Sequence, residues 1–148
     1  MAERSRRIEE IDMTLEEKQQ DIIDEFGMFD DWMDKYEYII ELGKELPIIS
    51  DENKTDDKLI EGCQSRVWLN TTVADGKMNF TADSDAIITK GIIGLLVRVL
   101  GGETPKDVAT TELRFINEIG LHEHLSPTRS NGLASMVKRM KLSAIAAS

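Results

Sequence analysis

The stretch Arg66-Val-Trp-Leu-Asn-Thr-Thr-Val-Ala-Asp-Gly-Lys-Met-Asn-Phe-Thr-Ala82 decides the fold class, because its pattern differs from the helical patterns on either side of it. From Val67 to Val73 every second residue is apolar or β-branched, which is the period of a strand with one buried face. Asp75-Gly76 follows, and this dipeptide favours a two-residue hairpin turn because both of its positions need positive φ. The sequence therefore predicts that Lys77–Ala82 returns as the antiparallel partner strand.

The segments around this hairpin complete an α+β fold. Lys58–Glu61 lies just before it and is expected to add a third strand, giving a small antiparallel three-stranded sheet packed with helices. Helical spacing of apolar residues occurs on both sides of the sheet, in the segments 14–27, 31–42, 84–100, 104–120 and from 126 onward. Because strands and helices occupy separate parts of the chain, the class is α+β rather than alternating α/β.

Capping signals mark where these helices begin. Thr14, with a glutamate three residues later, forms a capping box in which each side chain satisfies the other residue's backbone N–H. Ser84 is a candidate N-cap for the segment 84–100, and Ser126-Pro127 opens the last helix. The segment 84–100 is apolar nearly all round, which predicts a buried central helix.

The 148-residue chain has the length of one compact domain. We expect this domain to span residues 14–148 and residues 1–13 to form a flexible N-terminal tail. The basic start of the chain has no apolar segment behind it, and no apolar run is long enough to cross a bilayer, so the sequence predicts a cytoplasmic protein without membrane contact. The net charge of −10 disfavours nucleic acid as a partner, because an acidic protein repels the phosphate backbone.

A single cysteine, Cys63, limits the chemistry open to this chain. One thiol cannot form an internal disulfide, and there is no C-x-x-C pair for zinc binding or dithiol redox chemistry. It also disfavours an iron–sulfur cluster held by this chain alone, since clusters need several thiolates. We expect no metal site and no cofactor.

The surroundings of Cys63 leave two interpretations open. Gly62 precedes the cysteine and permits a sharp bend, and three polar residues follow it. Arg66, the last of them, would favour the thiolate, which is the form that attacks sulfur. The segment therefore either presents a reactive thiol to a partner protein or contains an inert core residue, because unpaired cysteine is among the most buried residue types.

Other polar residues are weaker candidates. Arg129 is either a surface arginine in the first turn of the last helix or a guanidinium that reaches an anionic sulfur or a partner carboxylate. His122 and His124 diverge on a helix at their spacing, so a solvated segment is expected rather than a metal site. Asp83 and Asp85 bracket Ser84, and a metal pair is conceivable there, but N-cap chemistry explains Ser84 and Asp85.

Three segments of the chain together resemble the SufE family, the sulfur acceptors that assist cysteine desulfurases. Leu59-Ile-Glu-Gly-Cys-Gln-Ser-Arg-Val-Trp68 is similar to the family's active-cysteine segment. Ala82-Asp-Ser-Asp-Ala86 followed by Lys90-Gly91 is the second match. Leu125-Ser-Pro-Thr-Arg-Ser-Asn-Gly132 resembles the arginine-bearing turn ahead of the family's last helix. Order and spacing agree from about residue 14 to the end of the chain.

The resemblance implies an α+β fold shared with the U-type iron–sulfur scaffold proteins, with the cysteine at the tip of a loop. It implies that Cys63 accepts a persulfide sulfur and that Arg129 assists near the sulfur or the partner. The residues implied to shape the cysteine loop or to contact the partner are Glu61, Gly62, Gln64, Ser65 and Arg66.

The implied function is sulfur transfer. The chain would take sulfur from a pyridoxal-phosphate-dependent cysteine desulfurase of the SufS or CsdA kind, stimulate that enzyme, and pass the sulfur to iron–sulfur scaffold proteins. Pyridoxal phosphate is expected on the desulfurase, so this chain would act as an acceptor and activator rather than as a stand-alone enzyme. Three alternatives stay open: a non-catalytic adaptor, a cluster scaffold that would need more cysteine ligands, and a regulatory thiol.

Overall fold

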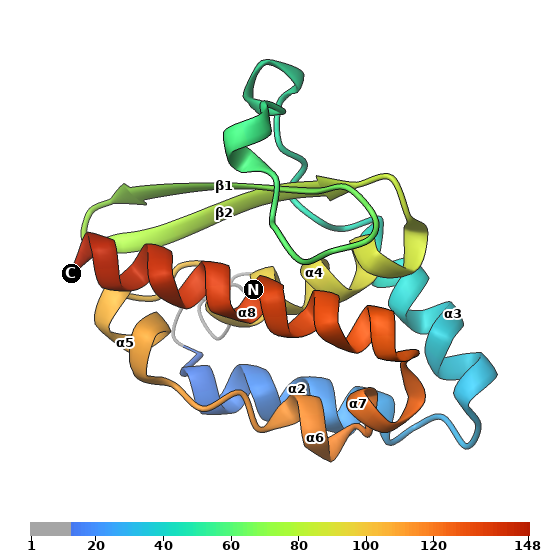
Figure 1. Cartoon of the computed structure of the whole chain (residues 1–148). Helices are drawn as coiled ribbons and strands as arrows, with labels where there is room; N and C mark the ends of the chain where they lie inside the picture. Colours follow the sequence, from blue (N-terminus) through green and yellow to red (C-terminus); the bar gives the residue numbers. More distant parts are fainter. Residues whose placement is uncertain (1–12) are drawn as a thin grey trace, which may run out of the picture.

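The computed structural model describes residues 13–148, in which helices pack against one face of a two-stranded antiparallel sheet (Figure 1). The strands are β1 (Val67–Ala74) and β2 (Lys77–Ser84). The helices are α2 (Leu15–Phe26), α3 (Trp32–Gly43), α4 (Ile87–Leu100), α5 (Pro105–Thr110), α6 (Phe115–Glu118), α7 (Leu121–His124) and α8 (Pro127–Ala147), with short 3-10 turns η1 (Asp51–Asn53) and η2 (Asp56–Lys58). All but the last residue of the predicted N-terminal tail lie outside the described residues.

The hairpin at the centre of the sequence is confirmed. Strand β1 pairs antiparallel with β2 in a register that runs from Val67 opposite Ser84 to Ala74 opposite Lys77. The turn between them has φ of 54° at Asp75 and 75° at Gly76, as an Asp-Gly two-residue turn requires.

The predicted third strand over Lys58–Glu61 is wrong, because only a single bridge forms there. Leu59 bridges Trp68, and the Ile60 N–H donates to the Val67 carbonyl at 2.9 Å. The 3-10 turn η2 already occupies Lys58, and Gly62 turns the chain away with a φ of 89°. The sheet of the described residues therefore has two strands, and the likeness to U-type scaffold proteins stays a prediction.

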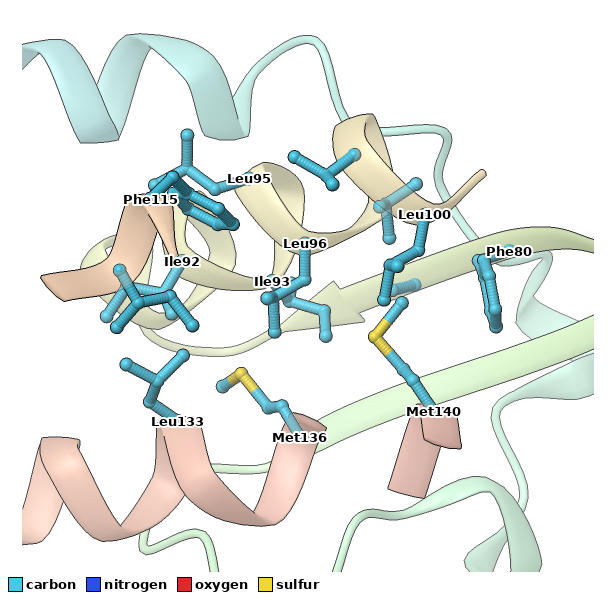
Figure 2. Close-up of a cluster of buried hydrophobic side chains, with 14 of the residues drawn as sticks. Phe80, Ile92, Ile93, Leu95, Leu96, Leu100, Phe115, Leu133, Met136 and Met140 are labelled. Atoms are coloured by element: carbon cyan, nitrogen blue, oxygen red, sulfur yellow. The ribbon is translucent and has the colours of Figure 1, made fainter. Parts of the chain in front are cut away.

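Helix α4 is the central buried helix that its composition predicted. Figure 2 shows its apolar side chains in the middle of the core, with Phe115 on one side and side chains from α8 on the other. Leu133, Met136 and Met140 of α8 point toward α4 in this view, and each is at most 1% exposed. Packing between α4 and α8 fixes the N-terminal half of α8, which carries part of the candidate site.

The expected start of α4 at Ser84 is corrected. The helix begins at Ile87 after the N-cap residue Ala86, which has no side-chain cap. Ser84 remains in β2 and accepts a hydrogen bond from the Ala86 N–H at 3.2 Å, whereas the Asp85 carboxylate accepts one from the Arg66 N–H at 3.1 Å. The strand continues further than its sequence suggested because Ser84 pairs with Val67.

The apolar segment 104–120 was expected to form one helix, and it forms two short ones instead. Helix α5 starts at Pro105 behind the N-cap Thr104 and ends at Thr110. The chain then bends, and the fully buried Gln19 of α2 supplies the missing backbone partners. Its amide donates to the Glu112 carbonyl at 3.1 Å and accepts from the Phe115 N–H at 3.2 Å.

Helices α3 and α4 cross at a glycine contact. A Cβ added at Gly91 would lie 2.2 Å from the Ile39 carbonyl oxygen, which is far inside van der Waals contact. One turn along α4, a Cβ at Gly94 would meet nothing closer than 3.6 Å. The close approach of the two helix backbones therefore depends on Gly91.

The substitution Gly91→Ala is expected to lower the free energy of unfolding by about 3 kcal/mol, because the two helices must separate to admit the methyl group. Gly94→Ala is the matched control, since its methyl group fits and alanine favours the helix by about 1 kcal/mol. Urea unfolding measures both. Equal stability of the two variants would contradict the crossing contact.

Candidate functional site

The candidate site is built where the loop that contains Cys63 meets the N-terminal half of α8. The loop connects the Leu59 bridge to the start of β1, and it is the green segment that descends toward α8 in Figure 1. The Cys63 thiol donates a weak hydrogen bond to the Gly132 carbonyl, with 3.6 Å between sulfur and oxygen. Gly132 is buried in α8, and a Cβ there would lie 3.5 Å from the sulfur. The absence of a side chain at Gly132 therefore leaves room for the thiol.

Cys63 is half-buried, neither locked in the core nor fully exposed. Burial alone raises the pKa of its thiol, because the thiolate would lose solvation. The expectation that Arg66 favours the thiolate is therefore wrong for this conformation. The Arg66 residue is exposed, and its backbone is held by Asp85.

Two cavities lie beside Cys63. One, of about 310 Å³, is lined by the loop and by residues of α4 and α8: Cys63, Gln64, Ser65, Thr89, Ile92, Ser126, Thr128, Arg129, Gly132 and Met136. The other, of about 430 Å³, is lined by the loop and by the segment that precedes it, and includes Glu61, Gly62 and Arg66. Cys63, Gln64 and Ser65 line both cavities, so this part of the loop has open space beside it, although Cys63 also packs against the core.

The structure brings Arg129 to the same cavity as Cys63. It lies in the first turn of α8, where the Ser126 hydroxyl accepts a hydrogen bond from its backbone N–H at 3.2 Å. Its side chain is exposed and makes no ion pair with the residues from 13 to 148. A guanidinium in this position is available to an anion in the cavity.

Gly62 allows the loop to lie against α8. Its φ of 89° is in the left-handed region, and a Cβ there would come within 2.3 Å of the Ser135 hydroxyl. Glu61 beside it is exposed and lines a third cavity with Ser135 and Arg139. Of the residues implied to shape the loop, Gly62 is thus required by the loop's conformation and by its contact with α8. Glu61 is exposed to solvent.

Two ties hold the ends of the loop, and sequence reasoning missed both. At the start, the Arg139 guanidinium of α8 donates to the Leu59 carbonyl at 3.0 Å and to the Asp57 carbonyl at 2.8 Å. At the end, Asp85 holds Arg66 through its carboxylate and through its own N–H, which donates to the Arg66 carbonyl at 3.3 Å. No sequence signal indicates Arg139, and Asp85 was assigned to a helix cap.

The other polar groups singled out in the sequence have structural partners. Asp83 pairs with Lys54 at 2.7 Å and with Lys90 at 3.4 Å. His124 is exposed, as expected for a solvated segment, and its ring stacks on Trp32 with 4.0 Å between centroids. Residues 13–148 hold no cluster of three or more histidine, cysteine, aspartate or glutamate side chains suited to a metal ion.

Comparison with known proteins supports the family resemblance of the segments that meet at this site. The sequence model of SufE, described as an Fe-S metabolism associated domain, matches residues 20–144. The chain belongs to the SufE family. This SufE-family chain is therefore associated with Fe-S metabolism.

Two relatives show how far the likeness extends. An uncharacterized SufE-like protein of Rhizobium etli is 43% identical over 125 residues, which cover 81% of this chain and 84% of that protein. An uncharacterized SufE-like protein of Rhizobium meliloti is 38% identical over 125 residues, covering 81% of this chain and 89% of that protein. Both alignments span most of the SufE domain.

A solved structure shares the fold. The solution structure of a hypothetical protein from Thermus thermophilus superposes with a TM-score of 0.73 at 22% identity, covering 88% of this chain and 95% of that one. In the described part of the SufE-family chain, no helix has the length and apolarity that a membrane span requires.

Removal of the Arg139 tie is expected to loosen the SufE cysteine loop. Arg139→Met keeps much of the aliphatic stem but leaves two carbonyls without their donor, so the free energy of unfolding should fall by about 1–3 kcal/mol. Amide hydrogen exchange over residues 59–66 should accelerate. Lys138→Met, one residue earlier on α8 and exposed, is the control and should change neither measurement.

The raised pKa of Cys63 predicts slow alkylation at neutral pH. In the folded protein, the rate of reaction with iodoacetamide should rise with pH at a higher midpoint than in the urea-unfolded chain, because burial disfavours the thiolate that reacts. Mass spectrometry of samples quenched across a pH series gives both midpoints. A folded-state midpoint at or below the unfolded one would contradict the burial effect.

Proposed function

We propose that this chain accepts sulfur from a cysteine desulfurase onto Cys63 and passes it on for iron–sulfur cluster assembly. The observation that carries the proposal is the half-buried Cys63 thiol on a loop between two cavities, with Arg129 lining one of them. Membership of a family associated with Fe-S metabolism supports this direction.

The chemistry needs one thiol and no cofactor on this chain. The Cys63 thiolate attacks the outer sulfur of a persulfide on the desulfurase. A sulfur–sulfur bond forms at Cys63, the partner's sulfur–sulfur bond breaks, and the partner's cysteine leaves as a thiolate. The persulfide passes from the partner's cysteine to Cys63 while the partner's persulfide becomes a thiolate, so no external oxidant is consumed. The pyridoxal phosphate that releases sulfur from free cysteine belongs to the desulfurase.

The resting loop supports a gated acceptor. In the free protein the thiol donates to Gly132, and burial raises its pKa, which lowers the thiolate fraction that oxidants attack. Displacement of the loop by a docked desulfurase would return the sulfur to a polar environment and restore its thiolate fraction. Because the loop ends are tied at Leu59 and Arg66, the movement would be confined to the residues between them.

Removing sulfur from the desulfurase would let that enzyme turn over faster, so this chain would act as its activator. A desulfurase of the SufS or CsdA kind is the proposed donor, and an iron–sulfur scaffold protein is the proposed recipient. The proposed location is the cytoplasm, where thiols stay reduced.

The test pairs a desulfurase of the same pathway with this protein and free cysteine. The wild type should gain the mass of one sulfur atom, Cys63→Ser should gain none, and sulfide release by the desulfurase should rise only with the wild type. Intact-protein mass spectrometry and a sulfide assay on the same samples give both results. Undiminished stimulation by Cys63→Ser would favour a non-catalytic adaptor and exclude the acceptor role.

A further inference from the structure

Thr89 is a buried polar residue with no role in the proposed transfer of sulfur to Cys63. It lies in the first turn of α4, is 8% exposed, and lines the same cavity as Cys63 and Arg129. Its hydroxyl has no hydrogen-bond partner among residues 13–148. Every fully enclosed polar side-chain atom in that range is paired, so the unpaired hydroxyl must open onto the cavity. The hydroxyl is therefore free to hydrogen-bond to a group that enters the cavity.

The groups around the cavity suit a persulfide better than a thiol. The resting thiol has a proton to donate, and the Gly132 carbonyl accepts it. A Cys63 persulfide has no proton on Sγ, and its terminal sulfur is anionic at neutral pH because persulfides are stronger acids than thiols. That sulfur needs donors, and the cavity offers the Thr89 hydroxyl together with the unpaired Arg129 guanidinium.

The walls of the cavity define where the terminal sulfur would lie. Ile92 and Met136 form its apolar side, and the hydroxyl-bearing residues Thr89 and Thr128 line it as well. A volume of about 310 Å³ has room for one more sulfur atom on Cys63 without moving the core. Thr89 extends from α4, a rigid buried helix, and so its hydroxyl is positioned before the sulfur arrives.

We propose that Thr89 binds the terminal sulfur of the Cys63 persulfide, donating the hydrogen bond that holds it inside the cavity. This inference rests on the proposed function, because only a protein that carries sulfur has use for such a site. The hydroxyl distinguishes the loaded from the unloaded protein: it bonds the sulfur when sulfur is present, and it makes no hydrogen bond to residues 13–148 when sulfur is absent. The loop would then stay closed over its cargo until a recipient opens it.

The test measures how long the persulfide survives. Inorganic tetrasulfide loads Cys63 without a desulfurase, since the thiolate takes one sulfur and trisulfide leaves. Dithiothreitol then removes the sulfur as hydrogen sulfide and is itself oxidised to its disulfide. Intact-mass spectrometry follows the loss of one sulfur atom. Thr89→Val should shorten the half-life about tenfold, which corresponds to one hydrogen bond to a charged group.

The controls separate a binding role from a packing role. Thr89→Ser keeps the hydroxyl and should restore the half-life, whereas Thr72→Val on the exposed part of β1 should leave it unchanged. The melting temperature of unloaded Thr89→Val should not fall, because valine has nearly the same shape and the hydroxyl that it replaces makes no hydrogen bond to residues 13–148. Thr89→Ala gives the same loss of half-life should the valine variant fail to fold.

Two results would overturn the inference: a persulfide half-life in Thr89→Val equal to that of the wild type, or a serine variant that decays as fast as the valine variant. The proposed function fails separately, if a desulfurase does not load the wild type. In that case a Thr89 effect on the tetrasulfide-loaded protein would still establish the binding site.

Discussion

The burial of helix α4 is the constraint on which the rest of this structure depends. Its apolar surface is covered by α3 at the Gly91 crossing, by Phe115 and by the apolar stripe of α8. The hydrophobic effect drives this packing without direction, and the small residues at the crossing set how closely the helices approach. Since α8 is positioned by its contacts with α4, the distance between Thr89 on one helix and Gly132 on the other is set by the core.

The cysteine loop is built on that core: Ile60 is buried in it and Cys63 packs against it. Hydrogen bonds at its two ends hold it in place, and a glycine with positive φ lets it lie against α8. Between these points the loop stands between two cavities. Firmly held ends suit a thiol that must be sheltered at rest and exposed during transfer, because only the short segment between them has to move.

The second family segment illustrates how one short sequence serves several purposes. Asp83 pairs with Lys54 and Lys90, Asp85 holds the end of the cysteine loop, and Gly91 admits the close approach of α3. None of these side chains caps α4. They lie where β2 ends and α4 begins, so each contacts a different neighbour: the lysines, the cysteine loop or α3.

The sequence by itself determined the hairpin, the central helix, most helix starts and the identity of the single thiol. These follow from local physics: Asp-Gly selects its turn, apolar spacing selects strand or helix, and Thr14, Thr104 and Ser126 cap the helices that follow them. Only the tertiary structure decided that the third strand is reduced to one bridge and that the Gln19 side chain hydrogen-bonds the backbone between α5 and α6. It also decided that Arg129, Thr89 and Cys63 line one cavity. Such features depend on contacts between residues far apart in the chain, and neither periodicity nor spacing encodes which distant groups the core will bring together.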